Sequence, residues 1–135
     1  MRSYVLDANV LLGYLATRGG AEETERLFQD GEHGRSELLM STVNWGEVYY
    51  VLRRRCDAAE TRKVMSQFRL GLTLVGADEA VAERAAELKS TYKIGYADAY
   101  AAELAISNGA TLVTSDSEFR KLGRSLALRL LRSGR

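Results

Sequence analysis

Four acidic residues stand where a carboxylate group could take part in metal-assisted hydrolysis: Asp7, Glu47, Asp98 and Asp116. Asp7 and Asp116 each come shortly after a short apolar run. Mg²⁺ and Mn²⁺ prefer oxygen ligands, and gathered carboxylates hold such an ion while waters and a substrate phosphate complete its shell. An ion held in this way lowers the pKa of a bound water and neutralises charge that develops on a phosphodiester.

Asp98 lies where helical periodicity predicts an inward-facing residue. The residues three, four and seven positions later are Ala101, Ala102 and Ala105, so we expect this carboxylate on the small, apolar stripe of its helix. Glu103 falls roughly 140° further round the helix, and we expect it on the solvent side.

Glu47 shows the same pattern, with Val43 four residues before it and Tyr50 and Val51 three and four residues after it. A charge on a buried stripe costs several kcal/mol unless something pairs with it. No basic residue stands three or four positions from Glu47 or Asp98. A cation from outside the chain is therefore the expected partner.

Three of these acids also have an ordinary structural explanation. Asp7 and Asp116 can be N-caps of the helices that they precede. Asn44 and Glu47 have the spacing of a capping box. Asp98 is harder to explain in this way because it lies inside an alanine-rich helix, and the four acids together are less easily explained as caps.

Other catalytic chemistries have too few of the required residues. The chain contains one histidine, His33, in a glycine-flanked loop, and one cysteine, Cys56, after three arginines. These are too few for a structural zinc site, and they give little support to a nucleophile–base pair. A lone cysteine excludes an internal disulfide and indicates a reducing, cytoplasmic setting. The phosphate-binding G-x-x-x-x-G-K-[ST] loop is also missing.

Short apolar runs alternate with helical patterns along the chain. We expect strands at 4–6, 38–40, 72–75 and 111–113, with a possible edge strand at 126–128. We expect helices at 10–16, 21–29, 43–54, 58–70, 79–89 (capped by Asp78), 96–107 and 118–122. This alternation predicts a three-layer α/β/α sandwich with a mostly parallel sheet of four to five strands. Ligands gather at the carboxyl ends of such strands.

The 135 residues, 46% of them hydrophobic, suit one domain spanning 1–135 with a single core. No apolar run reaches the roughly 18 residues of a membrane span. The net charge is only +1, but basic residues gather at Arg53–Arg55 and from Arg120 to Arg135. Such runs are usually solvated surface, and they become informative only beside a site that cleaves phosphodiesters.

Four short motifs then resemble one family, and they span nearly the whole chain: YVLDAN at 4–9, STVNWGE at 41–47, YADAYAA at 96–102 and LVTSDSEF at 112–119. In order and spacing they resemble the PIN-domain ribonucleases, and within them the VapC-like toxins of toxin–antitoxin pairs. The resemblance implies a sheet of about five strands and a metal site for Mg²⁺ or Mn²⁺ formed by Asp7, Glu47, Asp98 and Asp116.

The resemblance also implies endonucleolytic hydrolysis of RNA by a metal-activated water, leaving a 5′-phosphate and a 3′-hydroxyl. Asn9 and Thr114 match polar supports of the site, and Glu118 stands where many relatives have a further Asp. The expected partners are RNA, a VapB-like antitoxin and a second copy of the chain in a homodimer. Because clustered carboxylates repel RNA, we expect Arg53, Arg54 and Arg55, or the basic tail, to bind it.

Three alternatives differ in class. A PIN domain that has lost activity would bind RNA or a protein without cutting. A phosphoacceptor receiver domain would need adjacent acids after the first strand and a lysine after the last. A haloacid-dehalogenase-like phosphatase would need an acid at the position of Asn9. The presence of all four acids favours the nuclease.

Overall fold

A computed structural model describes residues 1–132 and contains one five-stranded sheet in which every strand pair is parallel. The strands, in the spatial order β3-β2-β1-β4-β5, are β1 (Arg2–Leu6), β2 (Ser36–Ser41), β3 (Thr73–Val75), β4 (Thr111–Thr114) and β5 (Leu128–Leu130). All carboxyl ends therefore lie along one edge of the sheet, where the sequence predicts the site.

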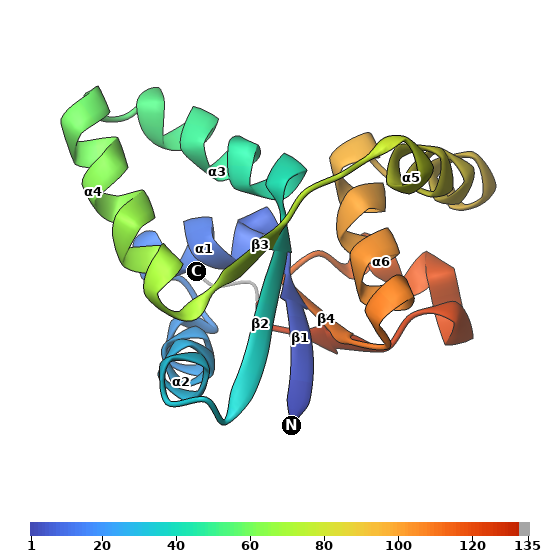
Figure 1. The fold of residues 1–135 in the computed structure, drawn as a ribbon, viewed down its shortest axis with the longest axis horizontal. Helices are drawn as coiled ribbons and strands as arrows, with labels where there is room; N and C mark the ends of the chain where they lie inside the picture. The colour runs from blue at the N-terminus through green and yellow to red at the C-terminus, as the bar shows by residue number, and fades with distance from the viewer. Residues whose placement is uncertain (133–135) are drawn as a thin grey trace.

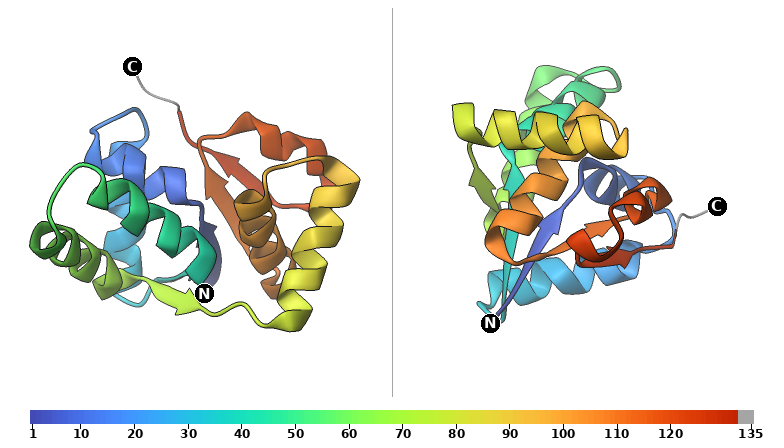
Figure 2. Two further views of the ribbon diagram at one scale, coloured as in Figure 1. Left: turned by 90° about the horizontal axis from the view of Figure 1, so that it is seen from above. Right: turned by 90° about the vertical axis from the view of Figure 1, so that its right-hand side faces the viewer.

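Helices cover both faces of this sheet (Figure 1). The helices of one face are α1 (Ala8–Leu15), α2 (Ala21–Glu32), α3 (Thr42–Arg53) and α4 (Ala58–Phe68), followed by the short 3₁₀ turn η1 (Arg69–Gly71). Those of the other face are α5 (Glu79–Tyr92), α6 (Tyr96–Asn108) and the 3₁₀ segment η2 (Ser117–Ser125). Seen from above in Figure 2, the two helical layers are separated by the strands.

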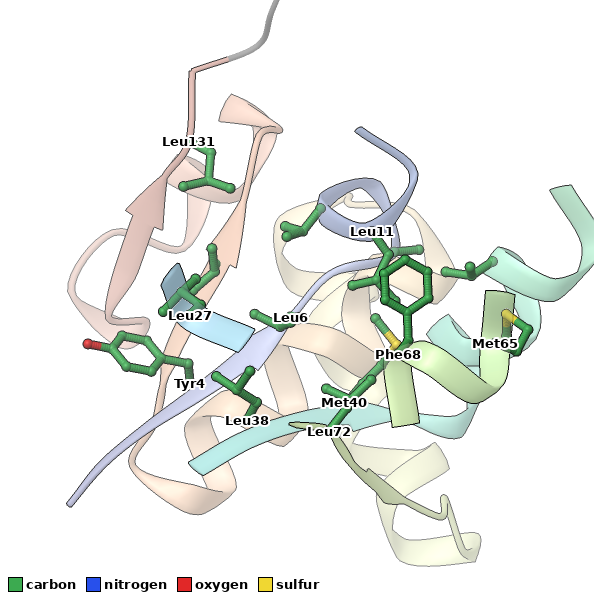
Figure 3. Close-up of a cluster of buried hydrophobic side chains, with 14 of the residues drawn as sticks. Tyr4, Leu6, Leu11, Leu27, Leu38, Met40, Met65, Phe68, Leu72 and Leu131 are labelled. Atoms are coloured by element: carbon green, nitrogen blue, oxygen red, sulfur yellow. The ribbon is translucent and has the colours of Figure 1, made fainter. Parts of the chain in front are cut away.

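The buried strand residues alternate between the two layers. Tyr4 and Leu6 of β1 pack with α1–α4, whereas Val5 between them packs with α5 and α6. Figure 3 shows the first of these two cores, in which Leu6 lies among side chains such as Met40 and Phe68. Burial on both faces explains why the strands are continuous apolar runs in the sequence.

The predicted fold class is confirmed, and most elements lie within a few residues of their expected places. The edge strand is Leu128–Leu130 and not 126–128, because Thr114 pairs with Leu130 and Leu126 belongs to the buried end of η2. Asp78 caps α5 as expected, with its Oδ1 accepting from the Val81 N–H at 2.9 Å. Among residues 1–132, no helix is long and apolar enough to cross a membrane.

The expectation that Glu103 faces solvent is wrong. Its side chain is 3% exposed, and its carboxylate accepts from Arg84 Nε at 3.0 Å and from the Ser107 hydroxyl. The reason is that α6 packs between the sheet and α5, so the side of the helix away from the sheet is covered as well. Periodicity identifies the apolar stripe but does not show a second neighbour.

Candidate active site

The four candidate acids come from segments that meet at the carboxyl edge of the sheet. Asp7 directly follows β1, and Asp116 follows the neighbouring strand β4 with one residue, Ser115, between them. Glu47 lies on α3, which begins directly after β2, and Asp98 lies in the first turn of α6. The parallel order of β2, β1 and β4 thus gathers residues that are more than 100 positions apart in the sequence.

Asp7 is buried, with 3% of its surface exposed, and each of its carboxylate oxygens has a different partner. Oδ1 accepts from the Ala8 N–H at 2.8 Å and so caps α1. Oδ2 accepts from the Thr114 hydroxyl at 2.9 Å. The cap and the site are therefore not alternatives, because the same carboxylate begins the helix and faces the neighbouring strand.

Thr114 is fully buried and connects Asp7 with the loop after β4. Its oxygen accepts from the Asp116 N–H at 3.0 Å and lies 3.2 Å from Asn9 Nδ2. The hydroxyl has one proton, and the charged, closer Asp7 oxygen is a better acceptor than Asn9 Oδ1 at 3.3 Å. Asn9 Oδ1 instead accepts from the Ser115 N–H at 3.2 Å. Asn9 and Thr114 thus form hydrogen bonds beside Asp7 and Asp116, and their role as polar supports stays a prediction.

Asn44 holds Glu47 in a way that the sequence did not indicate. Ser41, and not Asn44, is the N-cap of α3, so the capping-box interpretation is wrong. The fully buried Asn44 amide donates to Glu47 Oε1 and to the Ala97 carbonyl, each at 3.1 Å. It thereby ties α3 to α6 beside Asp98. Among the described residues, the buried Asn44 Oδ1 has no donor.

Glu47 itself is exposed, so its expected place on a buried stripe is wrong. The buried residues of α3 are Asn44, Val48 and Leu52, while Tyr50 is 61% exposed. Glu47 therefore lies beside the buried stripe of α3, where its carboxylate is exposed to solvent.

Asp98 is nearer to a helix end than its alanine-rich surroundings suggest. It is the third residue of α6, which begins at Tyr96 as expected, directly after the N-cap Gly95. Its Oδ2 lies only 2.9 Å from where a Cβ on Gly95 would be, so a larger residue there would displace the carboxylate. Ala101, Ala102 and Ala105 are buried as expected.

The acids act on one another's ionisation. Burial raises the pKa of Asp7 from 3.8 to about 7, against the effect of the Thr114 hydrogen bond, and the Asp98 and Glu47 charges contribute to the rise. Burial, and then the charges of Asp116 and Glu47, raise the pKa of Asp98, and Glu118 adds a smaller repulsion. The four predicted acids, together with Glu118, therefore lie close enough for their charges to interact.

Within residues 1–132, none of the four acids forms an ion pair, whereas Glu118 pairs with Lys121 at 3.1 Å. Carboxylates without counter-charges at one edge of a sheet are the kind of oxygen ligand that a hard divalent cation prefers. No three acidic, histidine or cysteine side chains of that part of the chain are close enough to hold an ion together. An ion shared by several of these acids would therefore require side chains to move.

The predicted RNA-binding arginines lie at the end of α3, away from the candidate acids. Arg53 ends α3, six residues and about 9 Å along the axis from Glu47. It donates to the Cys56 carbonyl at 2.9 Å, and Arg54 stacks over the Tyr50 ring. All three arginines are exposed, and their role stays a prediction.

The residues of the basic tail lie in different surroundings. Arg120, Lys121 and Arg124 are exposed on η2, while Arg129 pairs with Glu23 at 2.9 Å. Arg132 is exposed beyond the carboxyl end of β5. Arg135 lies outside the described residues.

Comparison with known families matches residues 4–125 to the PIN domain. The chain belongs to the PIN domain family. The matched range includes all four acids and both polar supports, and the family prediction is confirmed.

Solved structures with the same fold include VapBC2 from Rickettsia felis bound to a promoter DNA fragment (TM-score 0.75, 19% identity, covering 96% of this chain and 98% of that chain). DNA-bound VapBC from Salmonella typhimurium is equally similar (TM-score 0.75, 18% identity, 96% and 98%). Another is the sarcin–ricin loop cleaving toxin VapC20 from Mycobacterium tuberculosis (TM-score 0.67, 18% identity, 89% and 95%). No curated protein sequence matches the chain.

Proposed function

We propose that this PIN domain is a metal-dependent endoribonuclease in which Asp7, Glu47, Asp98 and Asp116 bind Mg²⁺ or Mn²⁺. The observation that carries the proposal is a set of acids without counter-charges that interact at the carboxyl edge of the sheet, two of them with a raised pKa. A folded protein keeps such repulsion where a ligand relieves it.

A bound divalent ion would supply a water of lowered pKa and would neutralise charge on the phosphodiester. The chain's own residues prepare the ligands. The Ala8 and Thr114 hydrogen bonds fix both oxygens of Asp7, and Asn44 fixes one oxygen of Glu47. Gly95 leaves space for the Asp98 carboxylate. These supports reduce the ligand motion that would otherwise be lost on binding.

We further propose that the protein is the toxin of a toxin–antitoxin pair, with a VapB-like protein as its partner and a homodimer as its assembled form. Support comes from the fold, which it shares over nearly its whole length with the VapC chains of VapBC complexes. A catalytically inactive PIN domain that binds RNA or protein is the competing possibility.

The test is cleavage of a labelled mixed-sequence RNA in Mg²⁺, in Mn²⁺ and in EDTA, with the product ends mapped. We expect metal-dependent products with a 5′-phosphate and a 3′-hydroxyl, and loss of cleavage in Asp7→Asn and Asp98→Asn. Glu83→Gln, an acid-to-amide change at an exposed position of α5, serves as the control. Binding of RNA without cleavage in any metal would favour the inactive domain.

A further inference from the structure

Two neighbouring hollows adjoin the candidate active site on the side of Asn9. The smaller has a volume of about 70 Å³, and its walls include Asn9, Ser115, Arg18 and Arg132. The larger, of about 460 Å³, shares both arginines with the smaller one and is also lined by Arg26. The two hollows are here called together the arginine pocket, because the same two arginines line both.

Hydrogen bonds attach the arginine pocket to the catalytic edge. The Asn9 side chain forms part of its wall and also contacts Thr114 and the Ser115 N–H. The Leu131 N–H donates to the Thr114 carbonyl at 2.7 Å, which places Arg132 at the same end of the sheet. A group bound in the pocket would therefore be linked to Asp7 through the Asn9 and Thr114 side chains.

The two walls of the pocket are held together by the loop between α1 and α2. Gly20 has φ +93°, and a Cβ on it would be 3.1 Å from Leu131 Cβ. The Thr24 hydroxyl, itself buried, donates to the Gly20 carbonyl at 3.0 Å and fixes the loop to α2. In Figure 2 this loop lies beside the last described residues of the chain. Arg18 and Arg132 thus reach the same pocket from segments 114 positions apart.

The charge of the pocket is opposite to that of the acids beside it. Within residues 1–132, Arg18, Arg26 and Arg132 form no ion pair. Of the two acids on its wall, Glu23 already pairs with Arg129 at 2.9 Å, which leaves Glu22. Guanidinium groups bind phosphate oxygens through two donors at once. Because the acids repel a polyanion, RNA needs cationic contacts directly beside them.

We propose that the arginine pocket binds a backbone phosphate of the RNA, one that flanks the phosphate placed at the acids, with Arg18 and Arg132 as the contacts. This inference rests on the proposed nuclease function. The pocket would hold the RNA at a second point, and this contact would fix the position of the RNA strand relative to the carboxylates.

The test compares two double variants of equal charge. Arg18→Gln with Arg132→Gln removes the pocket contacts. Arg2→Gln with Arg62→Gln removes two exposed charges elsewhere, one at the amino end of β1 and one on α4. Binding of a labelled mixed-sequence single-stranded RNA is measured by fluorescence anisotropy in EDTA at several salt concentrations. Thermal melting confirms that both variants fold.

We expect the pocket variant to bind severalfold more weakly at low salt, with a slope of log K against log salt that is smaller by about 1.4, or 0.7 for each lost contact. The control should keep the wild-type slope. Equal losses in both variants, or no change in the pocket variant, would overturn the proposal. Displacement of the RNA by polyglutamate at equal charge concentration would overturn it in favour of an acidic protein segment.

Cleavage assayed in parallel separates this inference from the function on which it rests. If wild type cleaves RNA and the pocket variant retains both cleavage and salt slope, the pocket is not a phosphate site although the nuclease function stands. If wild type binds RNA with the expected slope difference but cleaves nothing in any metal, the nuclease proposal fails and the phosphate site stands. If wild type binds no RNA, both proposals fail.

Discussion

The Thr114 hydroxyl donates to Asp7 Oδ2 at 2.9 Å, from the end of one strand to the end of its neighbour. This bond favours the charged form of a carboxylate whose pKa burial raises to about 7. Without it, Asp7 would hold its proton further into the range where a metal ligand must be deprotonated. Thr114 therefore acts on the site through the ionisation of Asp7.

Replacing Thr114 by valine keeps the shape of the side chain and removes the hydroxyl. We expect the pKa of Asp7 to rise and the pH–rate profile of RNA cleavage to shift to higher pH, with activity partly restored under alkaline conditions. Thr114→Ser, which keeps the donor, should keep the wild-type profile. A uniform loss at every pH would show that Thr114 has only a structural role.

The raised pKa of Asp7 also sets the pH dependence of stability in the metal-free protein. Between pH 3.8 and about 7, the folded protein keeps a proton that the unfolded chain has released. The free energy of unfolding should therefore fall as pH rises, from this group by at most about 1.4 kcal/mol per pH unit. Above about pH 7, Asp7 is deprotonated in both states, and the free energy of unfolding no longer changes because of this group.

Urea unfolding in EDTA, from about pH 4 to about pH 8, measures this effect. Asp7→Asn should show a flatter profile than wild type and should be relatively more stable at the alkaline end. All other titrating groups are common to the two proteins, so their contributions largely cancel in the comparison. Parallel profiles would contradict the raised pKa of Asp7.

Removing Asn44 should release Glu47. In Asn44→Ala, the Glu47 carboxylate loses its 3.1 Å bond, and α3 loses its link to the Ala97 carbonyl beside Asp98. We expect metal affinity, measured by Mn²⁺ titration calorimetry, to fall by about 10- to 100-fold. In a double-mutant cycle with Glu47→Gln the effects should not add, because both changes act on the same ligand. Additive losses would show that Asn44 acts elsewhere.

Divalent metal should stabilise the fold. An ion that binds only the native state adds about 2.7 kcal/mol at a hundredfold excess over its Kd. We therefore expect a higher melting temperature in millimolar Mn²⁺ or Mg²⁺ than in EDTA, and a much smaller rise in Asp98→Asn. A melting curve that does not change across the titration would count against a four-acid site.

The sequence predicts the sheet and the edge at which the acids meet. The apolar runs indicate buried strands, and Asp7 and Asp116 indicate where two of these strands end. The sequence does not predict the surroundings of a residue where these depend on packing against another helix or on the absence of a side chain. Glu103 is covered by α5, which periodicity within α6 cannot reveal. Gly95 precedes α6 at the expected place, but the sequence alone did not show that its missing side chain leaves space for the Asp98 carboxylate.

Long-range pairs are also beyond a local pattern. Arg18 follows an ordinary helix end, and Arg132 belongs to a basic run typical of solvated surface. Only the pairing of β5 with β4 and the close packing of Gly20 on Leu131 bring them to one pocket. The basic tail thus contains residues with different roles, since Arg129 is already paired with Glu23.

The last prediction concerns Arg53–Arg55. The structure places these residues at the end of α3, away from Glu47 and the other acids. If an RNA strand extends from the acids along α3, replacing all three by glutamine weakens binding and lowers the salt slope by up to about 0.7 for each contact. The metal-induced thermal shift should be retained, since the acids are unchanged.

Catalytically inactive Asp98→Asn protein, titrated with labelled RNA at several salt concentrations, is the background for this measurement. A charge change at Glu103 would be an unsuitable control, because this residue is buried against Arg84. Exposed Arg62 and Lys63 on α4 are the better choice, since they stand close in the sequence without belonging to α3. If the salt slope is the same with and without the three arginines, they are a solvated surface. Binding would then depend on the arginine pocket, and the variants of that pocket should show the reduced salt slope in the same assay.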